Sequence, residues 1–110
     1  MITWADFEKI DMRIGIITHV EQFPQARKPA YKLTIDFGIE MGIKKSSAQI
    51  TTLYDADKLV GTQVVCVVNF PPKQIGPFIS ECLVMGAYNA QGDIVLLKPE
   101  RGTQLGSKVG

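Results

Sequence analysis

The stretch MRIGIITHVE, residues 12–21, alternates its side chains with a period of two. This alternation predicts a half-buried β-strand rather than a helix. The face expected to be apolar carries Met12, Ile14, Ile16, Thr18 and Val20. Gly15 lies inside the stretch, and a glycine within a strand typically marks a bend or a bulge. The first long strand is therefore expected to bend.

Short segments with strand character follow this stretch, separated by proline and glycine. We expect strands at residues 31–37, 43–50, 63–69, 81–88 and 93–99, the first of which would turn inward Tyr31, Leu33, Ile35 and Phe37. A short helix is expected after a capping box at Thr3, ending by Asp11. A second helix would begin at Thr51 or Thr52 and end before Gly61, with an apolar stripe of Leu53, Ala56, Leu59 and Val60.

The order of these segments decides between fold classes. Strands and helices do not alternate, which argues against a parallel α/β sheet. A bent first strand and one helix between the third and fourth strands predict an all-β OB-fold, a five-stranded Greek-key barrel, here with terminal extensions. An SH3-like or other small barrel is the structural alternative. At 110 residues, a single domain over residues 1–110 is expected.

Composition limits the function classes. Hydrophobic residues make up 45% of the chain, enough for a core without disulfides or metal, and the net charge of +1 means that any phosphate would be bound by a local patch. Cys66 and Cys82 lie in apolar segments without CxxC spacing, and His19 is the single histidine, so we expect two reduced core thiols and no metal site. The N-terminus does not resemble a secretory signal, and no apolar run is long enough to span a bilayer. We expect a cytoplasmic protein without membrane insertion.

The stretch VVNFPPKQIGPFISECLVMGA, residues 67–87, places unusual loop chemistry between two apolar strands. In an OB barrel this loop would meet the Arg27-Lys28 loop and the lysine–serine strand at one groove. Lysines there would neutralise phosphate or attract an acidic partner, polar side chains would donate hydrogen bonds, and aromatic rings would stack a base or seat an apolar side chain. The candidate ligand-binding residues are Lys32, Lys44, Lys45, Ser46, Ser47, Gln49, Asn69, Phe70, Lys73, Ile75, Phe78, Ser80 and Glu81.

Structural roles compete with these assignments. Lys44 and Lys45 would equally suit a solvated edge, the rings of Phe70 and Phe78 would equally plug the end of the barrel, and Glu81 would equally pair with a lysine. Catalysis finds little support: no serine is placed near His19, and there is no phosphate loop or dinucleotide fingerprint. The chain is therefore not expected to be an enzyme or to need a cofactor.

Three segments carry a family resemblance: residues 6–38, GIKKSSAQIT at 42–51, and residues 67–87. They resemble the stand-alone tRNA-binding OB domains, and FPQARKPAYKLTIDFG at 23–38 is similar to the CsaA-type branch of export-related chaperones. The resemblance implies a homodimer assembled with the help of the terminal extensions, which fits an interface at Trp4 and Phe7. It also implies that the binding positions of the family fall on Lys44, Ser46, Ser47, Gln49, Asn69, Lys73, Ser80 and Glu81.

Two functions follow from this resemblance. The first is a non-enzymatic, CsaA-like chaperone that binds unfolded or export-bound polypeptides in the groove and cooperates with the secretion motor. The alternative is a tRNA-binding protein that uses the same groove to recognise tRNA structure rather than base sequence.

Overall fold

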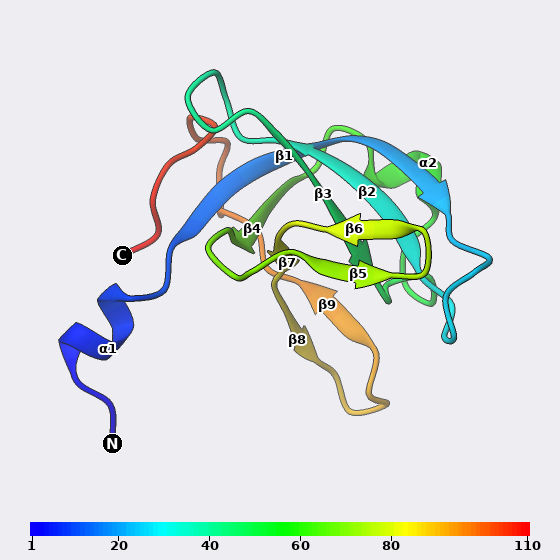
Figure 1. Cartoon of the computed structure of the whole chain (residues 1–110), viewed down its shortest axis with the longest axis horizontal. Helices are drawn as coiled ribbons and strands as arrows, with labels where there is room; N and C mark the ends of the chain where they lie inside the picture. The colour runs from blue at the N-terminus through cyan, green and yellow to red at the C-terminus, as the bar shows by residue number, and fades with distance from the viewer.

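A computed structural model describes residues 1–110 and shows strands curled into a small barrel (Figure 1). The main sheet has five antiparallel strands in the order β3-β2-β1-β4-β7. Its strands are β1 (Met12–Gln22), β2 (Tyr31–Asp36), β3 (Ile43–Ala48), β4 (Gln63–Val67) and β7 (Leu83–Val84). Because β3 packs against β7, the sheet is nearly closed on itself. The prediction of an OB-fold is confirmed.

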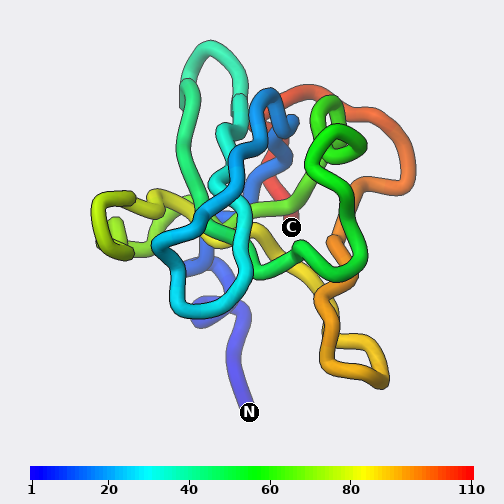
Figure 2. Tube along the Cα trace, turned by 90° about the vertical axis from the view of Figure 1, so that its right-hand side faces the viewer, coloured from blue at the N-terminus to red at the C-terminus, as the bar shows by residue number.

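The remaining elements decorate this barrel. Two hairpins are added, β5 (Lys73–Ile75) with β6 (Phe78–Ser80), and β8 (Gly86–Tyr88) with β9 (Ile94–Leu96). Two short helices are present, α1 (Trp4–Glu8) and α2 (Ala56–Leu59). Figures 1 and 2 show α1 projecting from the barrel at the N-terminus and the β8–β9 hairpin projecting separately. No helix is long and apolar enough to cross a membrane.

β1 bends because it pairs with a different strand along each of its two halves. Residues 12–16 pair with β4 and residues 16–22 pair with β2, with a register shift between Ile17 and His19. Gly15 lies in the first half, where an added Cβ would stand 2.5 Å from Cγ2 of Ile35 and 2.8 Å from the ring of Phe37. Only glycine lets β1 pass this close to Ile35 and Phe37. The irregularity in β1 lies further along the strand, between Ile17 and His19.

The face assigned to β1 from its alternation is wrong in the first half. Gly15 faces the core, and Ile17 is fully buried within it, whereas Ile16 is only half-buried. Met12 and Ile14 are buried outside the main core, on the half of β1 that also pairs with the C-terminal segment. The register shift moves the apolar face by one position, because a bulge inserts an unpaired residue.

The inward set of β2 is confirmed. These four residues, of which Phe37 directly follows β2, belong to the main core together with residues of β1, β3, β4 and α2. Its members include Ile17, Tyr31, Leu33, Ile35, Phe37, Ala48, Leu59, Val64 and Cys66. Ser46 is the single buried polar residue. The core therefore lies inside the barrel and leaves the outer faces of β3 and of the β5–β6 hairpin for other contacts.

The second helix is shorter than predicted. It begins after Asp55, and Leu53 and Val60 of the expected apolar stripe are exposed. Two hydrogen bonds hold Tyr54 outside a helix: the Tyr31 hydroxyl donates to the Tyr54 carbonyl at 2.8 Å, and the backbone N–H of Leu96 donates to the Tyr54 hydroxyl at 2.9 Å. These tertiary contacts override the local helical pattern.

The strand expected at residues 81–88 is broken in two. β7 pairs with β4, after which the N–H of Met85 donates to the carbonyl of Val65 at 2.9 Å, and the chain then turns away as β8. Gly86 lets β8 lie close to β9, since an added Cβ would stand 2.3 Å from Cγ2 of Ile94. The expected strand at 93–99 is reduced to β9, and the loop between the two apolar strands contains the β5–β6 hairpin.

Candidate functional site

A cleft of about 470 Å³ lies between the β5–β6 hairpin and the outer face of β3. We call it the apolar cleft, since its walls carry Phe70, Pro71, Ile75 and Leu83. Seven of the candidate binding residues line it: Ser47, Gln49, Phe70, Lys73, Ile75, Ser80 and Glu81. The structure therefore brings together the strand and the loop that the sequence placed at one groove.

A second cleft, of about 680 Å³, continues from the first towards the β1–β2 loop. We call it the basic cleft, because it is lined by Arg27, Lys28 and Lys73 and by no acidic residue. The two clefts share Ser47, Gln49, Lys73 and Ile75. The two clefts are therefore adjacent, and the groove is the name used below for both clefts together.

β3 supplies one wall of the groove through alternation along a strand. Ser46 and Ala48 point into the barrel and are buried, whereas Ser47 and Gln49 line both clefts. Lys45 has the same parity as Ser47 and Gln49 and is exposed, although it does not line either cleft.

Glu81 closes the barrel beside the groove. Its backbone N–H donates to the carbonyl of Lys45 at 2.7 Å, and its carboxylate Oε1 accepts from the N–H of Lys45 at 3.0 Å. Ser80 adds to this seam, because its Oγ accepts from the N–H of Ser47 at 3.3 Å. Glu81 forms no ion pair with a lysine side chain, so its partner is the backbone of β3.

Ser46 does not reach the groove, contrary to its assignment as a ligand-binding residue. Its side chain is fully buried, and its Oγ donates to the carbonyl of Cys82 at 2.8 Å. A small hydroxyl is needed there because it satisfies a buried carbonyl where β3 meets the chain after β6. Ser46 therefore helps to hold Cys82, which lines the apolar cleft, against β3 from inside the barrel.

The two cysteines are buried free thiols behind the apolar cleft. A hydrogen bond with Cys82, together with burial, raises the pKa of Cys66. The same hydrogen bond lowers the pKa of Cys82, with a further contribution from Lys44. Cys82 also lines the apolar cleft, whereas Cys66 does not.

Phe78 is buried, which favours a structural role over its assignment to ligand binding. Only 9% of its surface is exposed, and it packs edge-on against Phe23 with ring centroids 5.4 Å apart. The ammonium of Lys32 lies 4.9 Å from the Phe23 ring centroid and 5.7 Å from that of Phe78. This satellite cluster attaches the hairpin to the β1–β2 loop, so Phe78 has a structural role outside the main core. It also engages Lys32 in cation–π contacts.

Phe70 is the aromatic ring that remains available for a ligand, with 55% of its surface exposed at the wall of the apolar cleft.

Asn69 precedes Phe70, and both the oxygen and the nitrogen of its side-chain amide form hydrogen bonds with the backbone. Its Oδ1 accepts from the N–H of Asp11 at 3.0 Å, and its Nδ2 donates to the carbonyl of Lys9 at 2.7 Å. The side chain of Asn69 thus anchors the groove wall to the foot of α1 and does not line the groove.

The expected dimer residues lie on α1, away from the groove. Trp4 is 79% exposed, Phe7 is half-buried, and their rings pack edge-on with centroids 6.1 Å apart. No residue of α1 is buried. The helix thus presents an apolar face without a covering element in a single copy of the chain.

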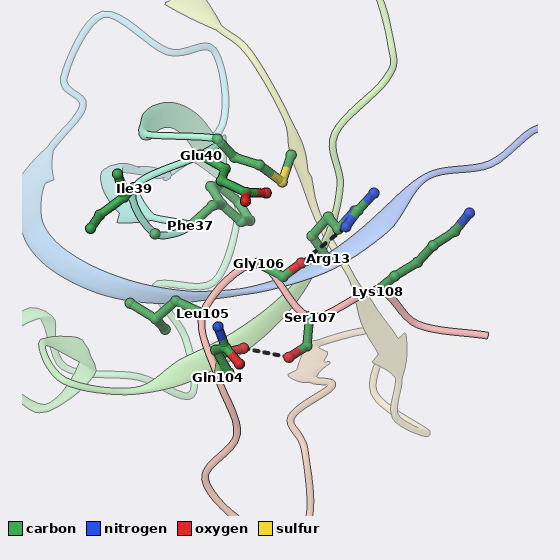
Figure 3. A pocket seen from close by; sticks show the side chains of 11 residues that line it. Arg13, Phe37, Ile39, Glu40, Gln104, Leu105, Gly106, Ser107 and Lys108 are labelled. Atoms are coloured by element: carbon green, nitrogen blue, oxygen red, sulfur yellow. Dashed lines mark hydrogen bonds between the residues drawn. The ribbon is translucent and has the colours of Figure 1, made fainter.

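A further cavity, of about 830 Å³, lies between the β2–β3 loop and the C-terminal segment (Figure 3). The guanidinium of Arg13 borders it and donates to Asp11 at 2.7 Å and to the carbonyl of Gly106 at 3.1 Å. None of the candidate residues lies there. The sequence carried no signal for this cavity, because its two walls are 60 or more residues apart and meet only in the fold.

Residues 12–108 match the family described as the putative tRNA binding domain, and the chain belongs to that family. Within solved structures it is similar to the CsaA chaperone protein of Picrophilus torridus, with 54% identity, a TM-score of 0.94 and full coverage of both chains. It is also similar to the chaperone CsaA of Bacillus anthracis, with 50% identity, a TM-score of 0.94, and coverage of 100% of this chain and 99% of that one. The resemblance to a CsaA-type tRNA-binding OB domain is confirmed.

Curated relatives extend the family to larger proteins. Methionine–tRNA ligase of Bdellovibrio bacteriovorus is 34% identical over 98% of this chain, and that of Neisseria meningitidis is 37% identical over 98%. The chain spans only 15% and 16% of the length of these two relatives.

Proposed function

We propose that the chain is a non-catalytic, CsaA-like chaperone that binds unfolded or export-bound polypeptides in the groove. The observation that carries this proposal is the set of apolar side chains left exposed at the apolar cleft, with Phe70 55% and Leu83 49% exposed. An exposed apolar wall costs solubility and is typical of a docking surface. The similarity to CsaA chaperones supports the same function.

The groove suits an extended chain more than a folded surface. Phe70, Ile75 and Leu83 would bury apolar side chains of the client, each worth roughly 1.5–3 kcal/mol when fully removed from water. Ser47 and Gln49 line both clefts and would hydrogen-bond the backbone of the client. Pro71 and Pro72 stiffen the wall, which lowers the entropy lost on binding.

Within this proposal the chain acts as a homodimer joined through Trp4 and Phe7, in the cytoplasm and without a cofactor. The uncovered apolar face of α1 supports pairing with a second copy. Two grooves on one dimer would let a long client bind twice, and the second contact would gain from effective concentration. Clients destined for export would then be handed to the secretion motor.

The test is binding of reduced, carboxymethylated α-lactalbumin, a permanently unfolded protein, measured by fluorescence anisotropy. We expect binding by the wild type and a loss of at least ten-fold in affinity for Phe70→Ser with Leu83→Ser. The matched control is Leu53→Ser with Val60→Ser, which removes two exposed apolar side chains outside the groove. No binding by the wild type, or equal losses in both double variants, would refute the proposal.

A second candidate function, tRNA binding, is favoured by the distribution of unpaired charge. Arg27, Lys28 and Lys73 line the groove, and the neighbouring strands β2 and β3 add Lys32, Lys44 and Lys45. None of these six cations forms an ion pair. Binding through Z phosphates predicts a log–log salt slope of about −0.7Z to −0.9Z. Lys45→Glu with Lys73→Glu should weaken binding of bulk tRNA and flatten this slope. Unchanged affinity or a flat wild-type response would exclude tRNA from the groove.

A further inference from the structure

The two clefts of the groove differ in chemistry although they share four lining residues. The apolar cleft is walled by Phe70, Pro71 and Leu83, and Ile75 is shared with the neighbouring cleft. The one acid in it, Glu81, already accepts a hydrogen bond from the backbone of Lys45. The apolar cleft therefore favours uncharged, apolar side chains of a ligand.

The basic cleft has the opposite character. Arg27, Lys28 and Lys73 are exposed, none of them is in an ion pair, and no acidic residue lines the cleft with them. In a chain whose net charge is only +1, three unpaired cations in one cleft are a local concentration of positive charge. Such a concentration raises the local density of anionic groups on a binding partner.

We infer that the ligand this groove prefers is an extended polypeptide segment in which acidic residues lie directly next to apolar ones. The apolar side chains occupy the apolar cleft while the carboxylates lie over the basic cleft. Lys73 borders both clefts and would lie where the apolar and acidic side chains of the ligand adjoin. This inference rests on the proposed function and names the class of client segments that the groove selects.

Three labelled peptides of equal length test the inference by fluorescence anisotropy. Each carries the same apolar block of leucine and phenylalanine, followed by a block of glutamate, of glutamine or of lysine. At low salt we expect the glutamate peptide to bind about ten-fold more tightly than the glutamine peptide, and the lysine peptide to bind most weakly. Because the charges are exposed, this ranking should shrink in 0.5 M salt, leaving the apolar contribution.

Matched variants connect the ranking to the basic cleft. Arg27→Glu with Lys28→Glu should reverse the preference between the glutamate and lysine peptides. Lys98→Glu with Lys108→Glu makes the same change in net charge at exposed, unpaired cations outside the groove, and the ranking should persist. Equal effects of both double variants would show that net charge, not the basic cleft, sets the preference, and would overturn the inference.

The outcomes separate this inference from the proposed function. Equal binding of all three peptides would refute the acidic preference and leave polypeptide binding standing. Failure of all three peptides and of the unfolded protein would refute the proposed function itself. Binding of bulk tRNA while the glutamate peptide fails to bind would assign the basic cleft to nucleic acid and overturn the inference.

Discussion

Glu81 and Lys45 are joined by two hydrogen bonds, one from the backbone N–H of Glu81 at 2.7 Å and one to its carboxylate at 3.0 Å. Together they connect β3 to the chain that follows β6, where the ladder of main-chain hydrogen bonds is incomplete. A side chain thus substitutes for a missing strand partner. The residue that borders the groove is also a residue that closes the barrel.

Glu81→Ala should therefore destabilise the fold. Losing a charged acceptor and leaving the N–H of Lys45 without a partner should lower the free energy of unfolding by about 1–3 kcal/mol. Glu81→Gln keeps a carbonyl oxygen at the same place and should cost less than Glu81→Ala. Urea unfolding measures both, with Glu40→Ala as the control, because Glu40 is exposed, forms no ion pair and should change stability by less than about 0.5 kcal/mol.

Gly15→Ala should destabilise the core without touching the groove. Its new methyl group would stand 2.5 Å from Cγ2 of Ile35, which forces β1 and β2 apart. Overpacking of this kind typically costs about 1–3 kcal/mol. Gly102→Ala is the matched control, because nothing lies within 4 Å of its added Cβ. Thermal unfolding tests this prediction, with a lower melting temperature expected for Gly15→Ala than for Gly102→Ala. Equal melting temperatures for the two variants would contradict it, because they would show that β1 and β2 accommodate the methyl group without cost.

Phe70 and Phe78 should give opposite results when each is changed to alanine. Phe78→Ala removes a buried ring from the Phe23 cluster and should lower the free energy of unfolding by about 3 kcal/mol. Phe70→Ala removes an exposed ring and should leave stability within about 0.5 kcal/mol while weakening client binding. Chemical unfolding and anisotropy on the same preparations test the pair. A Phe70→Ala variant that unfolds early but binds normally would contradict the assignment.

The two thiols should react with a disulfide reagent in a fixed order. A hydrogen bond with Cys82 and burial raise the pKa of Cys66, so Cys66 should stay protonated and unreactive in the native state. The same hydrogen bond lowers the pKa of Cys82, which lines the apolar cleft, so Cys82 should be labelled first. Peptide mapping by mass spectrometry reads the order, and a bound client should slow labelling of Cys82. Faster labelling of Cys66 would contradict the prediction, because it would show that the reagent reaches the thiols by a route other than the apolar cleft.

Asn69→Ala should loosen the connection between the groove wall and α1. The variant removes hydrogen bonds to the carbonyl of Lys9 and from the N–H of Asp11, so amide exchange at Asp11 should accelerate by about ten-fold or more. Asn89→Ala is the matched control, since Asn89 caps only the turn between β8 and β9. Its effect should stay within that turn.

Local patterns were enough to predict the barrel. The inward residues of β2 follow a strict period of two, and the strand expected at residues 63–69 is present as β4. The groove was located because its two walls are distinctive in sequence, one rich in lysine and serine and the other in proline and aromatic residues. These features depend on near neighbours in the chain.

What the sequence did not reveal depends on distant contacts. The bulge in β1 reverses which residues face the core, and its position is set by pairing with β2. Phe78 has the composition of an exposed loop residue, but Phe23 and Lys32 cover it from another loop. The second helix is shortened by the hydroxyls of Tyr31 and Tyr54, which are satisfied across the fold. In each case a tertiary partner overrides a local preference.

Asn69 carries one further consequence. The carboxamide that begins the groove wall also grips both ends of the short link between α1 and β1. A client that displaced the wall at Pro71 and Pro72 would therefore also disturb the hydrogen bonds between Asn69 and the residues that follow α1. If two copies join through that helix, loading of one groove and the strength of pairing must influence each other to the same degree, because such linkage is reciprocal.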